Sequence, residues 1–345
     1  MRGTYFLGNG AFETREMPER QLFETEVLVK VGACGVCGTD VHIYHGDKGS
    51  AEVRPPVVLG HELSGTIVET GAGVKKLKCG DRVAIDPNQY CGECHYCKAG
   101  KKQLCENLYA IGVNRDGGFA EYCYVPEAQC FLLDNRVPLE HGAMAEPLAC
   151  CIHGVDRAKI RLGDTVLVIG GGAIGLLMVQ LAKQSGASAV ILSEPVELRR
   201  KIGLEIGADA VIDPFREVLR ERLIQITGQD GVDVVIECVG NLSATEQAFA
   251  AAKRGTTILL FSVPKAGASY SLSLEDVYQK ELRIVGSLIN PDTHQRAVDM
   301  INRGKIQLDP LITHRFPLDQ VKEAIRMQMS NESIKVLTLR SKGRF

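Results

Sequence analysis

The stretch DTVLVIGGGAIGLLMVQLAK, residues 164–183, decides the fold of this 345-residue chain. It contains an apolar run, Val166–Ile169, that is typical of a buried strand. The run leads into a glycine turn, and apolar residues then recur at the i, i+3, i+4 and i+7 spacing of one helical face. These helical positions are Ile174, Leu177, Met178 and Leu181. A strand, a tight turn and a helix in this order begin a βαβ unit.

The same alternation continues through the residues that follow. Apolar runs alternate with helical patterns, as expected for a parallel sheet with right-handed crossovers. We expect strands at residues 187–194, 209–213, 233–240, 256–263 and 282–289, and helices at residues 197–208, 216–228 and 243–255. This part of the chain is therefore predicted to be a doubly wound α/β domain.

The residues before this α/β part follow a different pattern. They contain short apolar strands between Gly and Pro signals, which favours an all-β barrel or sandwich. The segment after the last strand is too short for another large domain, so we expect it to pack on the first part. We predict an α/β fold with a β-barrel, in which residues 1–147 and 288–345 form one domain and residues 148–287 the other.

Composition and charge exclude several classes of protein. The chain has 40 Lys and Arg against 42 Asp and Glu, which gives no electrostatic basis for binding nucleic acid or an anionic membrane. The longest uncharged run, residues 165–182, contains four glycines, so a strand, turn and helix explain it better than a membrane span. The N-terminus shows no secretory signal. We therefore expect a cytoplasmic protein whose twelve cysteines are metal ligands or thiols rather than disulfides.

The glycine turn has the spacing of a dinucleotide-binding site. Gly170 permits the tight turn, Gly172 lets the backbone approach a pyrophosphate, and Gly175 lets the helix pack on the strand. The helix that carries Ile174 then presents its free N–H groups and its positive dipole end to the phosphates. A plain flavodoxin-like turn is the alternative.

An acidic residue ends the next strand, 19 residues after the last glycine of the turn. Its carboxylate, on Glu194, can accept hydrogen bonds from both ribose hydroxyls and would repel a 2′-phosphate, which favours NAD over NADP. A solvated strand end remains an alternative for this residue. Arg199 and Arg200 follow on the next helix, either over the adenosine or on a solvated face, and Arg199 is kept as a cofactor-binding candidate.

Four cysteines are clustered as Cys91-x2-Cys94-x2-Cys97-x7-Cys105. Two-residue gaps let successive sulfurs converge on one ion, and four thiolates fill a tetrahedral zinc shell. A closed shell leaves no position for substrate, so the predicted zinc is structural. An iron–sulfur cluster and four free thiols are the alternatives.

Two further segments indicate a second metal, GACGVCGTDVHIY (residues 32–44) and GHELSGTIVETGAGV (residues 60–74). An open catalytic zinc needs about three protein ligands of N, S or O type and one free position. Cys37 and His61 fit that chemistry. Taken singly, a cysteine is more often a small buried apolar residue and a histidine more often a satisfied polar group.

The second segment resembles the G-H-E-x2-G-x5-G-x2-V signature of zinc-containing medium-chain alcohol dehydrogenases. CGTDVH, the four-cysteine lobe and VIGGGAIG occur in the matching order, and AEPLACCIHGV (residues 145–155) is similar to the polyol dehydrogenase branch. The resemblance covers essentially the whole chain. It implies a GroES-like catalytic domain, a Rossmann NAD-binding domain, two zinc ions per chain and a homo-oligomer, a tetramer more than a dimer.

The resemblance also implies roles for single residues. Cys37 and His61 match zinc ligands, and Glu62 matches a glutamate that ligates zinc or lies just outside its shell. Glu146 matches a position that supplies a third ligand in some members and holds the zinc-bound water in others. Asp40 would orient His61.

The proton-transfer residues implied by the resemblance are Thr39 and His42. Thr39 would accept the proton of the substrate hydroxyl and pass it through the nicotinamide ribose to His42. One departure concerns the substrate: where sorbitol dehydrogenases carry an Arg–Tyr pair, this chain has Ile289 and Asn290, so sorbitol is not assigned. The candidates for substrate specificity are Asn290, Tyr44 and His45. For each of them, a purely structural role is the alternative.

The expected function is a zinc-dependent, NAD-linked dehydrogenase that oxidises a secondary alcohol, favoured to be a sugar alcohol, reversibly to a ketone or ketose. A threonine or butanediol dehydrogenase on the same scaffold is the alternative. A zinc-independent enone or quinone reductase and a zinc-ribbon interaction module fit less well. The expected partner is a small molecule, with no nucleic acid and no membrane.

Overall fold

The computed structural model describes residues 1–46 and 51–340. The chain divides into two compact units, Met1–Ala149 with Ile289–Phe345, and Cys150–Leu288. The sequence pattern predicted domain boundaries after residues 147 and 287. In the structure the boundaries follow Ala149 and Leu288, which is two residues and one residue later.

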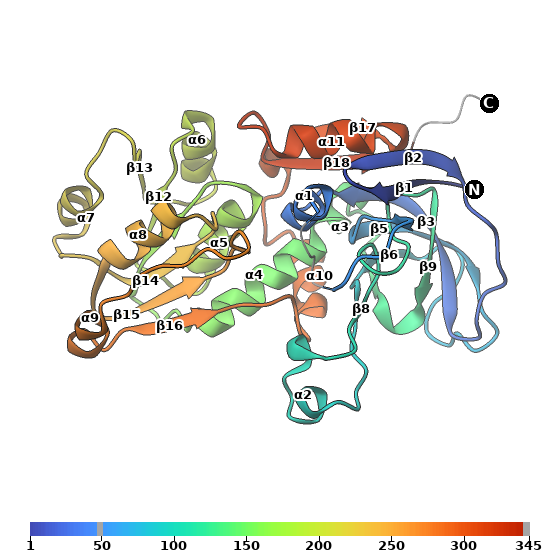
Figure 1. The fold of residues 1–345 in the computed structure, drawn as a ribbon, viewed down its shortest axis with the longest axis horizontal. Helices are drawn as coiled ribbons and strands as arrows, with labels where there is room; N and C mark the ends of the chain where they lie inside the picture. Colours follow the sequence, from blue (N-terminus) through green and yellow to red (C-terminus); the bar gives the residue numbers. More distant parts are fainter. Residues whose placement is uncertain (47–50, 341–345) are drawn as a thin grey trace. The chain divides into compact units, whose positions relative to one another are not determined.

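The first unit is built on a seven-stranded sheet (Figure 1). Its main path runs β10-β6-β5-β3-β18-β17, and β9 also pairs with β3. The strands are β3 (Glu26–Gly35), β5 (Glu62–Thr70), β6 (Arg82–Ile85), β9 (Tyr122–Pro126), β10 (Cys130–Leu132), β17 (Ile312–Pro317) and β18 (Lys335–Leu339). Because β18 pairs antiparallel with β3, segments from both ends of the chain share one sheet.

Alternation along β3 places the core of this sheet. Val27, Val29 and Val31 are buried while Lys30 is exposed, because successive side chains of a strand point to opposite faces. The longest antiparallel pairing joins β3 to β5, and Gly35 lies opposite Glu62 in its register.

Smaller elements complete the first unit. A three-stranded sheet contains β1 (Arg2–Gly8), β2 (Ala11–Glu16) and β4 (Val57–Val58), and β7 (Asn88–Gln89) pairs with β8 (Tyr109–Ala110). The helices are α1 (Gly38–Tyr44), α2 (His95–Lys98), α3 (Leu139–Gly142), α10 (His294–Asn302) and α11 (Val321–Gln328), with short 3-10 turns at Lys102–Leu104, Glu127–Gln129, Asp309–Leu311 and Leu318–Gln320. Helix α4 (Ala145–Ala158) begins in this unit and continues in the second.

The second unit is a six-stranded sheet of order β13-β12-β11-β14-β15-β16 in which every neighbouring pair is parallel. Counted within this unit, the order is 3-2-1-4-5-6, the arrangement of dinucleotide-binding folds. The strands are β11 (Thr165–Ile169), β12 (Ala189–Ser193), β13 (Ala210–Ile212), β14 (Val232–Glu237), β15 (Ala252–Leu260) and β16 (Arg283–Gly286).

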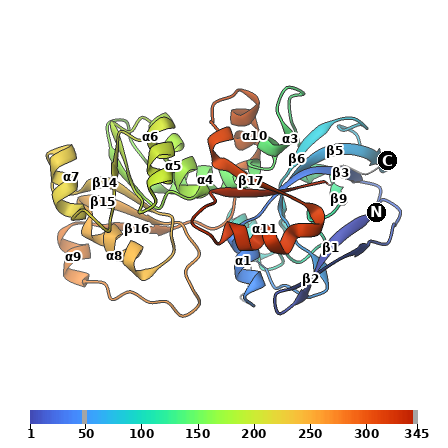
Figure 2. The same ribbon diagram turned by 90° about the horizontal axis from the view of Figure 1, so that it is seen from above.

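Helices cover both faces of this parallel sheet. They are α5 (Ala173–Gln184), α6 (Glu197–Glu205), α7 (Leu219–Thr227), α8 (Leu242–Ala250) and α9 (Leu274–Gln279). Figure 2 shows α5 and α6 on one side of the strands and α8 on the other. The predicted fold class, a β-rich part with a doubly wound α/β part, is confirmed.

One expected helix is shorter than its sequence pattern. The helix predicted at residues 243–255 ends at Ala250, and strand β15 already begins at Ala252. Ala252 pairs with Val232 in the parallel ladder, and both side chains are buried. Pairing and burial in the sheet therefore override the helix propensity of the alanine run.

The long uncharged run does not form a single helix. Residues 165–169 are strand β11, and α5 begins only at Ala173, after the glycine turn. In residues 1–46 and 51–340, no helix is both long and apolar enough to cross a membrane.

Candidate active site

Three potential metal ligands converge at one edge of the seven-stranded sheet. Cys37 follows β3 and caps α1, while His61 precedes β5 and Glu62 is its first residue. Because β3 and β5 are antiparallel and Gly35 pairs with Glu62, the end of one strand meets the start of the other. Ligand atoms of the three side chains all lie within 4.8 Å of one another.

Asp40 connects the first turn of α1 to this cluster. Its Oδ2 accepts a hydrogen bond from the Cys37 backbone N–H at 2.8 Å, which fixes the start of the helix. Its Oδ1 faces His61 Nδ1 at 3.8 Å, too far for a direct hydrogen bond. Among the described residues neither of these two buried atoms has another hydrogen-bond partner.

Burial and neighbouring anions shift the acid–base behaviour of the cluster. Burial alone would lower the pKa of His61, but Asp40, Cys37 and Glu146 together raise it well above its usual value. Burial raises the pKa of Asp40, against the opposing effect of His61. A thiol, an imidazole and a carboxylate crowded together in this way form the donor set that zinc prefers, so the residues fit a zinc ion.

A buried lysine completes the charge arrangement of the cluster. Lys335, the first residue of β18, is only 3% exposed, and its Nζ forms an ion pair with Glu62 Oε2. The same Nζ donates a hydrogen bond to the Val36 carbonyl at 3.0 Å. Burial alone would lower the pKa of Lys335, but Glu62 and Cys37 raise it, so the side chain is a cation.

Lys335 is not among the residues that the sequence pattern predicts for this cluster. The one signal in the sequence is a lysine that opens the apolar strand KVLTL, whose following three residues are buried. A single lysine before a strand is usually solvated, so this signal alone would not have assigned it to the cluster.

The other candidate residues lie on the elements that flank the cluster. Glu146, on α4, is buried and its charge acts on both His61 and Lys335. Thr39 and His42 are both on α1, three residues apart and half-buried, so they share one face of that helix.

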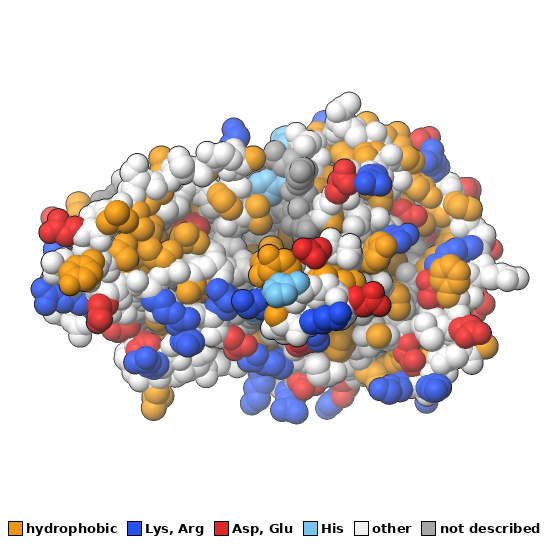
Figure 3. All heavy atoms as spheres, turned by 60° about the horizontal axis from the view of Figure 1, so that its bottom comes forward, with side chains coloured by type: hydrophobic (Ala, Val, Ile, Leu, Met, Phe, Trp, Pro, Cys, Tyr) orange, Lys and Arg blue, Asp and Glu red, His pale blue; other side chains and the backbone are white. Residues whose placement is uncertain are grey.

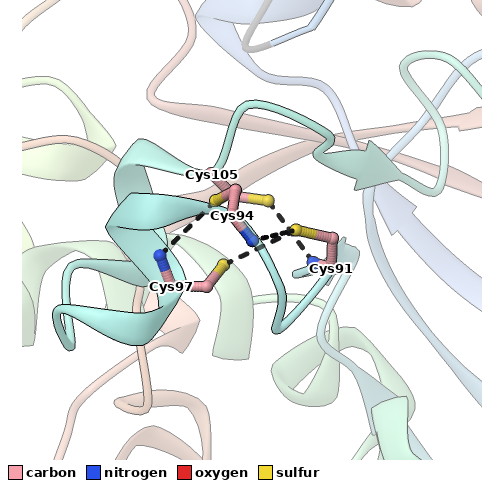
Figure 4. Close-up of side chains that lie close together, drawn as sticks. All are labelled: Cys91, Cys94, Cys97 and Cys105. Carbon is pink, nitrogen blue, oxygen red and sulfur yellow. Dashed lines mark hydrogen bonds between the residues drawn. The ribbon is translucent and has the colours of Figure 1, made fainter.

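The four clustered cysteines form a second group with metal-ligand geometry (Figure 4). Their sulfurs lie within 4.8 Å of one another and none is in a disulfide. Three backbone N–H groups donate to these sulfurs. The Cys94 N–H donates to Cys91 Sγ at 3.3 Å and the Cys97 N–H to Cys94 Sγ at 3.4 Å. The Cys91 N–H donates to Cys105 Sγ at 3.3 Å. These donors favour thiolates, and the Cys94 N–H is the main cause that lowers the pKa of Cys91 to about 6.

The glycine turn of the second unit has the geometry expected for a dinucleotide. Gly170 has a φ of +96°, which favours glycine, and a Cβ at Gly175 would collide with the Gly170 carbonyl. A Cβ at Gly172 would meet nothing within 4 Å, so the backbone there is open to a ligand. Ile174 lies in the first turn of α5.

Glu194 is fixed beside this turn. Its Oε2 accepts a hydrogen bond from the Gly171 N–H at 2.5 Å, and its Oε1 accepts one from the Val196 N–H at 2.7 Å. Arg199 also lies beside the turn, because a Cβ at Gly171 would be 3.3 Å from the Arg199 Cβ.

Arg200 has a different, structural position. Its guanidinium donates to the carbonyls of Glu194 and Pro195, both at 2.7 Å, and pairs with Asp213 at 3.1 Å. Of the two arginines on this helix, Arg199 therefore remains the candidate for the cofactor.

The structure favours a structural role for Asn290 over a role in substrate specificity. This residue is fully buried and donates to Asp86 Oδ1 at 3.2 Å, while it accepts from Asn88 Nδ2 at 2.6 Å. The ring of Tyr44 stacks on Phe12, with the ring centroids 6.4 Å apart. His45 is exposed at the end of α1, with its ring edge against Tyr44.

Comparison with known proteins agrees with this geometry. Residues 24–135 match the family model for the alcohol dehydrogenase GroES-like domain, and residues 173–303 match the model for zinc-binding dehydrogenases. A sorbitol dehydrogenase of Bombyx mori is 37% identical over 95% of this chain and 96% of its own length. An L-threonine 3-dehydrogenase of Pyrococcus furiosus is 35% identical over 90% of each chain.

A solved structure extends the likeness to the whole fold. A zinc-binding dehydrogenase of Sinorhizobium meliloti bound to NADP superimposes with a TM-score of 0.94 and 41% identity over 98% of each chain. Together with the matched domains, this makes the protein a dehydrogenase of the zinc-binding type. The chain belongs to the zinc-containing medium-chain alcohol dehydrogenase family, with polyol dehydrogenases among its relatives.

Proposed function

We propose that this protein oxidises a secondary alcohol, a sugar alcohol in preference, to a ketone or ketose with NAD as the acceptor. The observation that carries the proposal is the convergence of Cys37, His61 and Glu62 in a chain that also has the glycine turn. When bound, zinc supplies Lewis-acid polarisation of the alcohol, and NAD takes up the hydride.

Four residues of the cluster have proposed roles in holding the metal. Cys37 and His61 would hold the zinc, with Glu62 as a third ligand or just outside the shell, and with Glu146 as a third ligand or as the group that holds the water of the zinc. The Asp40 carboxylate, whose Oδ1 lies 3.8 Å from His61 Nδ1, would attract this ring nitrogen once it carries a proton and so orient the ring toward the metal.

Proton removal falls to the same short helix. Thr39 would accept the substrate proton, and His42 would take up a proton at the other end of the route. Because the two side chains share a face of α1, one helix positions both ends of this route. The α1 helix is itself anchored at Cys37, so metal binding and proton transfer are held by one element.

The four-cysteine site is proposed to hold a second, structural zinc. All four thiols are used, so no position is left for substrate. The alternative of a nucleic-acid module needs a basic surface around this lobe. Lys102, in this lobe, forms an ion pair with Asp292 at 2.8 Å. On the face of the molecule drawn in Figure 3, Lys and Arg side chains are interspersed with Asp and Glu side chains.

NAD is the proposed cofactor because the Glu194 carboxylate is held at the end of β12 by two backbone N–H groups. A fixed negative charge there disfavours the 2′-phosphate of NADP. The relative from Sinorhizobium meliloti is bound to NADP, so the preference of this chain needs direct measurement.

The substrate class rests on the likeness to sorbitol dehydrogenase, and threonine is the second candidate because its dehydrogenase is nearly as similar. The test is the initial rate of NADH formation with NAD, and of NADPH formation with NADP, over free and phosphorylated polyols, L-threonine and 2,3-butanediol. A polyol with the highest kcat/KM supports the proposal, and a higher kcat/KM for threonine or butanediol overturns the polyol assignment. The family resemblance also favours a homotetramer, which light scattering would measure.

A further inference from the structure

One edge of strand β9 is open. In the described part of the chain, β9 pairs with β3 alone, in an antiparallel ladder. In such a ladder only every second residue exchanges backbone hydrogen bonds with the partner strand. The Glu121 carbonyl and the Glu127 N–H, just outside the two ends of β9, bond to backbone groups on the β3 side at 3.0 and 2.8 Å. The residues at the alternate positions, Tyr122 and Tyr124, therefore point their backbone N–H and C=O groups away from β3.

The outward backbone groups of these two tyrosines have almost no partners. Strand β1 covers the chain only up to Glu121, whose N–H donates to the Arg2 carbonyl at 2.9 Å. Beyond this point, the one hydrogen-bonding contact from a described residue is the Cys123 thiol, 3.9 Å from the Tyr124 carbonyl. Unpaired N–H and C=O groups along a strand are a template on which another chain can add.

A groove of about 740 Å³ lies against this open edge. It is lined mainly by β9 and by residues of two segments, 17–26 and 109–117, all of the first unit. Its volume is within the range of about 300–1,000 Å³ that is typical of ligand sites. Two of its rings are exposed, Phe23 at 67% and Tyr109 at 47%, and aromatic side chains of this kind anchor partner chains at protein interfaces.

Two arginines beside this groove have no acidic partner among the described residues. Arg115 Cζ lies 4.7 Å from the centroid of the Tyr109 ring. Arg340 Cζ lies 5.3 Å from the centroid of the Tyr122 ring. Each guanidinium is thus held over a ring of the groove, while within residues 1–46 and 51–340 its N–H groups form no hydrogen bond and no ion pair.

The acidic side chains of the groove do not balance these two charges. Glu26 is already engaged, because the Arg20 guanidinium donates to both of its oxygens, at 2.7 and 2.9 Å. Asp116 Oδ1 accepts the Val58 N–H at 2.8 Å. Two guanidinium groups therefore stand against one carboxylate without a cationic partner. The charge that remains to be matched is positive, and its complement is a carboxylate.

We propose that this groove docks an extended, acidic peptide segment of a partner protein, which adds to the outer edge of β9 as a further strand. Backbone hydrogen bonds to Tyr122 and Tyr124 supply affinity for an extended chain, while Arg115 selects a carboxylate. The groove shares no residue with the metal cluster or the glycine turn, so this inference is independent of the proposed dehydrogenase activity.

The test measures the binding of labelled peptides to the full chain by fluorescence anisotropy. The probe is a fluorescein-labelled pentapeptide in which glutamate alternates with valine. One matched peptide has lysine in place of glutamate, and another has a methyl group on every backbone nitrogen, which removes the donors that an added strand needs. The protein variants are Arg115→Gln and, as a control, Arg326→Gln, at an exposed arginine of the same unit with no acidic partner in the described part of the chain.

We expect saturable binding of the acidic peptide to wild type. The dissociation constant should rise about tenfold or more with either matched peptide and in Arg115→Gln, because each change removes charge-assisted or backbone hydrogen bonds. Arg326→Gln binds as wild type. The bound acidic peptide also slows amide hydrogen exchange in residues 122–126, because the outward N–H groups become hydrogen-bonded.

The inference is overturned if the acidic peptide does not bind, if the lysine or N-methylated peptide binds equally well, or if Arg115→Gln has no effect. Two further results would overturn the choice of a partner protein as the occupant. Tighter binding to a chain that stops at Arg340 would assign the groove to the chain's own residues 341–345. Dissociation of an oligomer by the peptide, measured by sedimentation, would assign it to a second copy of the chain.

Discussion

At the scale of one residue, the proposed preference for NAD rests on the backbone contacts of Glu194. Its two carboxylate oxygens each accept a backbone N–H, from Gly171 and from Val196, so the charge is fixed beside the glycine turn rather than free to move aside. A fixed anion repels a phosphate more effectively than a mobile one, because it cannot relax away from it.

Replacing this charge tests its role. In Glu194→Gln the amide oxygen can still accept the Gly171 N–H, so the turn is kept while the charge is lost. We expect the ratio of kcat/KM for NAD to that for NADP to fall about tenfold, or about 1.4 kcal/mol, measured with one alcohol. Glu197→Gln, at an exposed position on α6, is the control. An unchanged ratio in Glu194→Gln would show that this carboxylate does not select the cofactor.

At the scale of elements, a buried polar network ties α10 to the strand before the cysteine lobe. Asn290 bonds to both Asp86 and Asn88, and Asn290 Nδ2 lies 3.4 Å from His294 Nδ1 on α10. His294 is 1% exposed, its Nε2 has no hydrogen-bond partner among the described residues, and burial lowers its pKa to about 3. Burial in the same network raises the pKa of Asp86 to about 6.

His294 is therefore expected to make the protein acid-sensitive. Its pKa in the folded state lies below the value of 6.5 in the unfolded chain, so only the unfolded chain takes up a proton as the pH falls below 6.5, and stability is lost. When the pH is lowered from 7 to 5, the free energy of unfolding measured in urea should fall by about 2 kcal/mol more in wild type than in His294→Gln. His95→Gln, at an exposed position on α2, should show no such gain. Equal pH dependence of wild type and His294→Gln would mean that the pKa of His294 is the same in the folded and the unfolded protein.

Local sequence patterns predict some elements of this fold correctly and fail for others. Periodicity and glycine spacing predicted the parallel sheet, because these signals are local. The end of α8 was mispredicted because Ala252 is decided by its pairing with Val232, which no local pattern shows. Lys335 was missed for the same reason, since its partner Glu62 is brought beside it only by the strand order β18-β3-β5.

For the whole molecule, the four-cysteine lobe should matter for stability more than for chemistry. Its α2 helix is four residues long and has no buried side chain, so a metal rather than a core is expected to hold it. In Cys105→Ser we expect loss of about one zinc per chain and a lower melting temperature, because the tetrahedral shell loses one of its four thiolates. Metal analysis and calorimetry check this. Full zinc content and an unchanged melting temperature would argue against a structural metal.

The central claim is that Cys37 and His61 hold the zinc on which turnover depends. Its most direct test is metal content, NADH binding and turnover measured on one preparation each of wild type, Cys37→Ala and, as a control at an exposed thiol, Cys79→Ala. We predict that Cys37→Ala loses one zinc per chain and more than about a thousandfold in kcat, which is about 4 kcal/mol of barrier, while NADH binds as in wild type. Cys79→Ala should match wild type in all three. Full turnover by Cys37→Ala protein verified to lack that zinc would contradict the account.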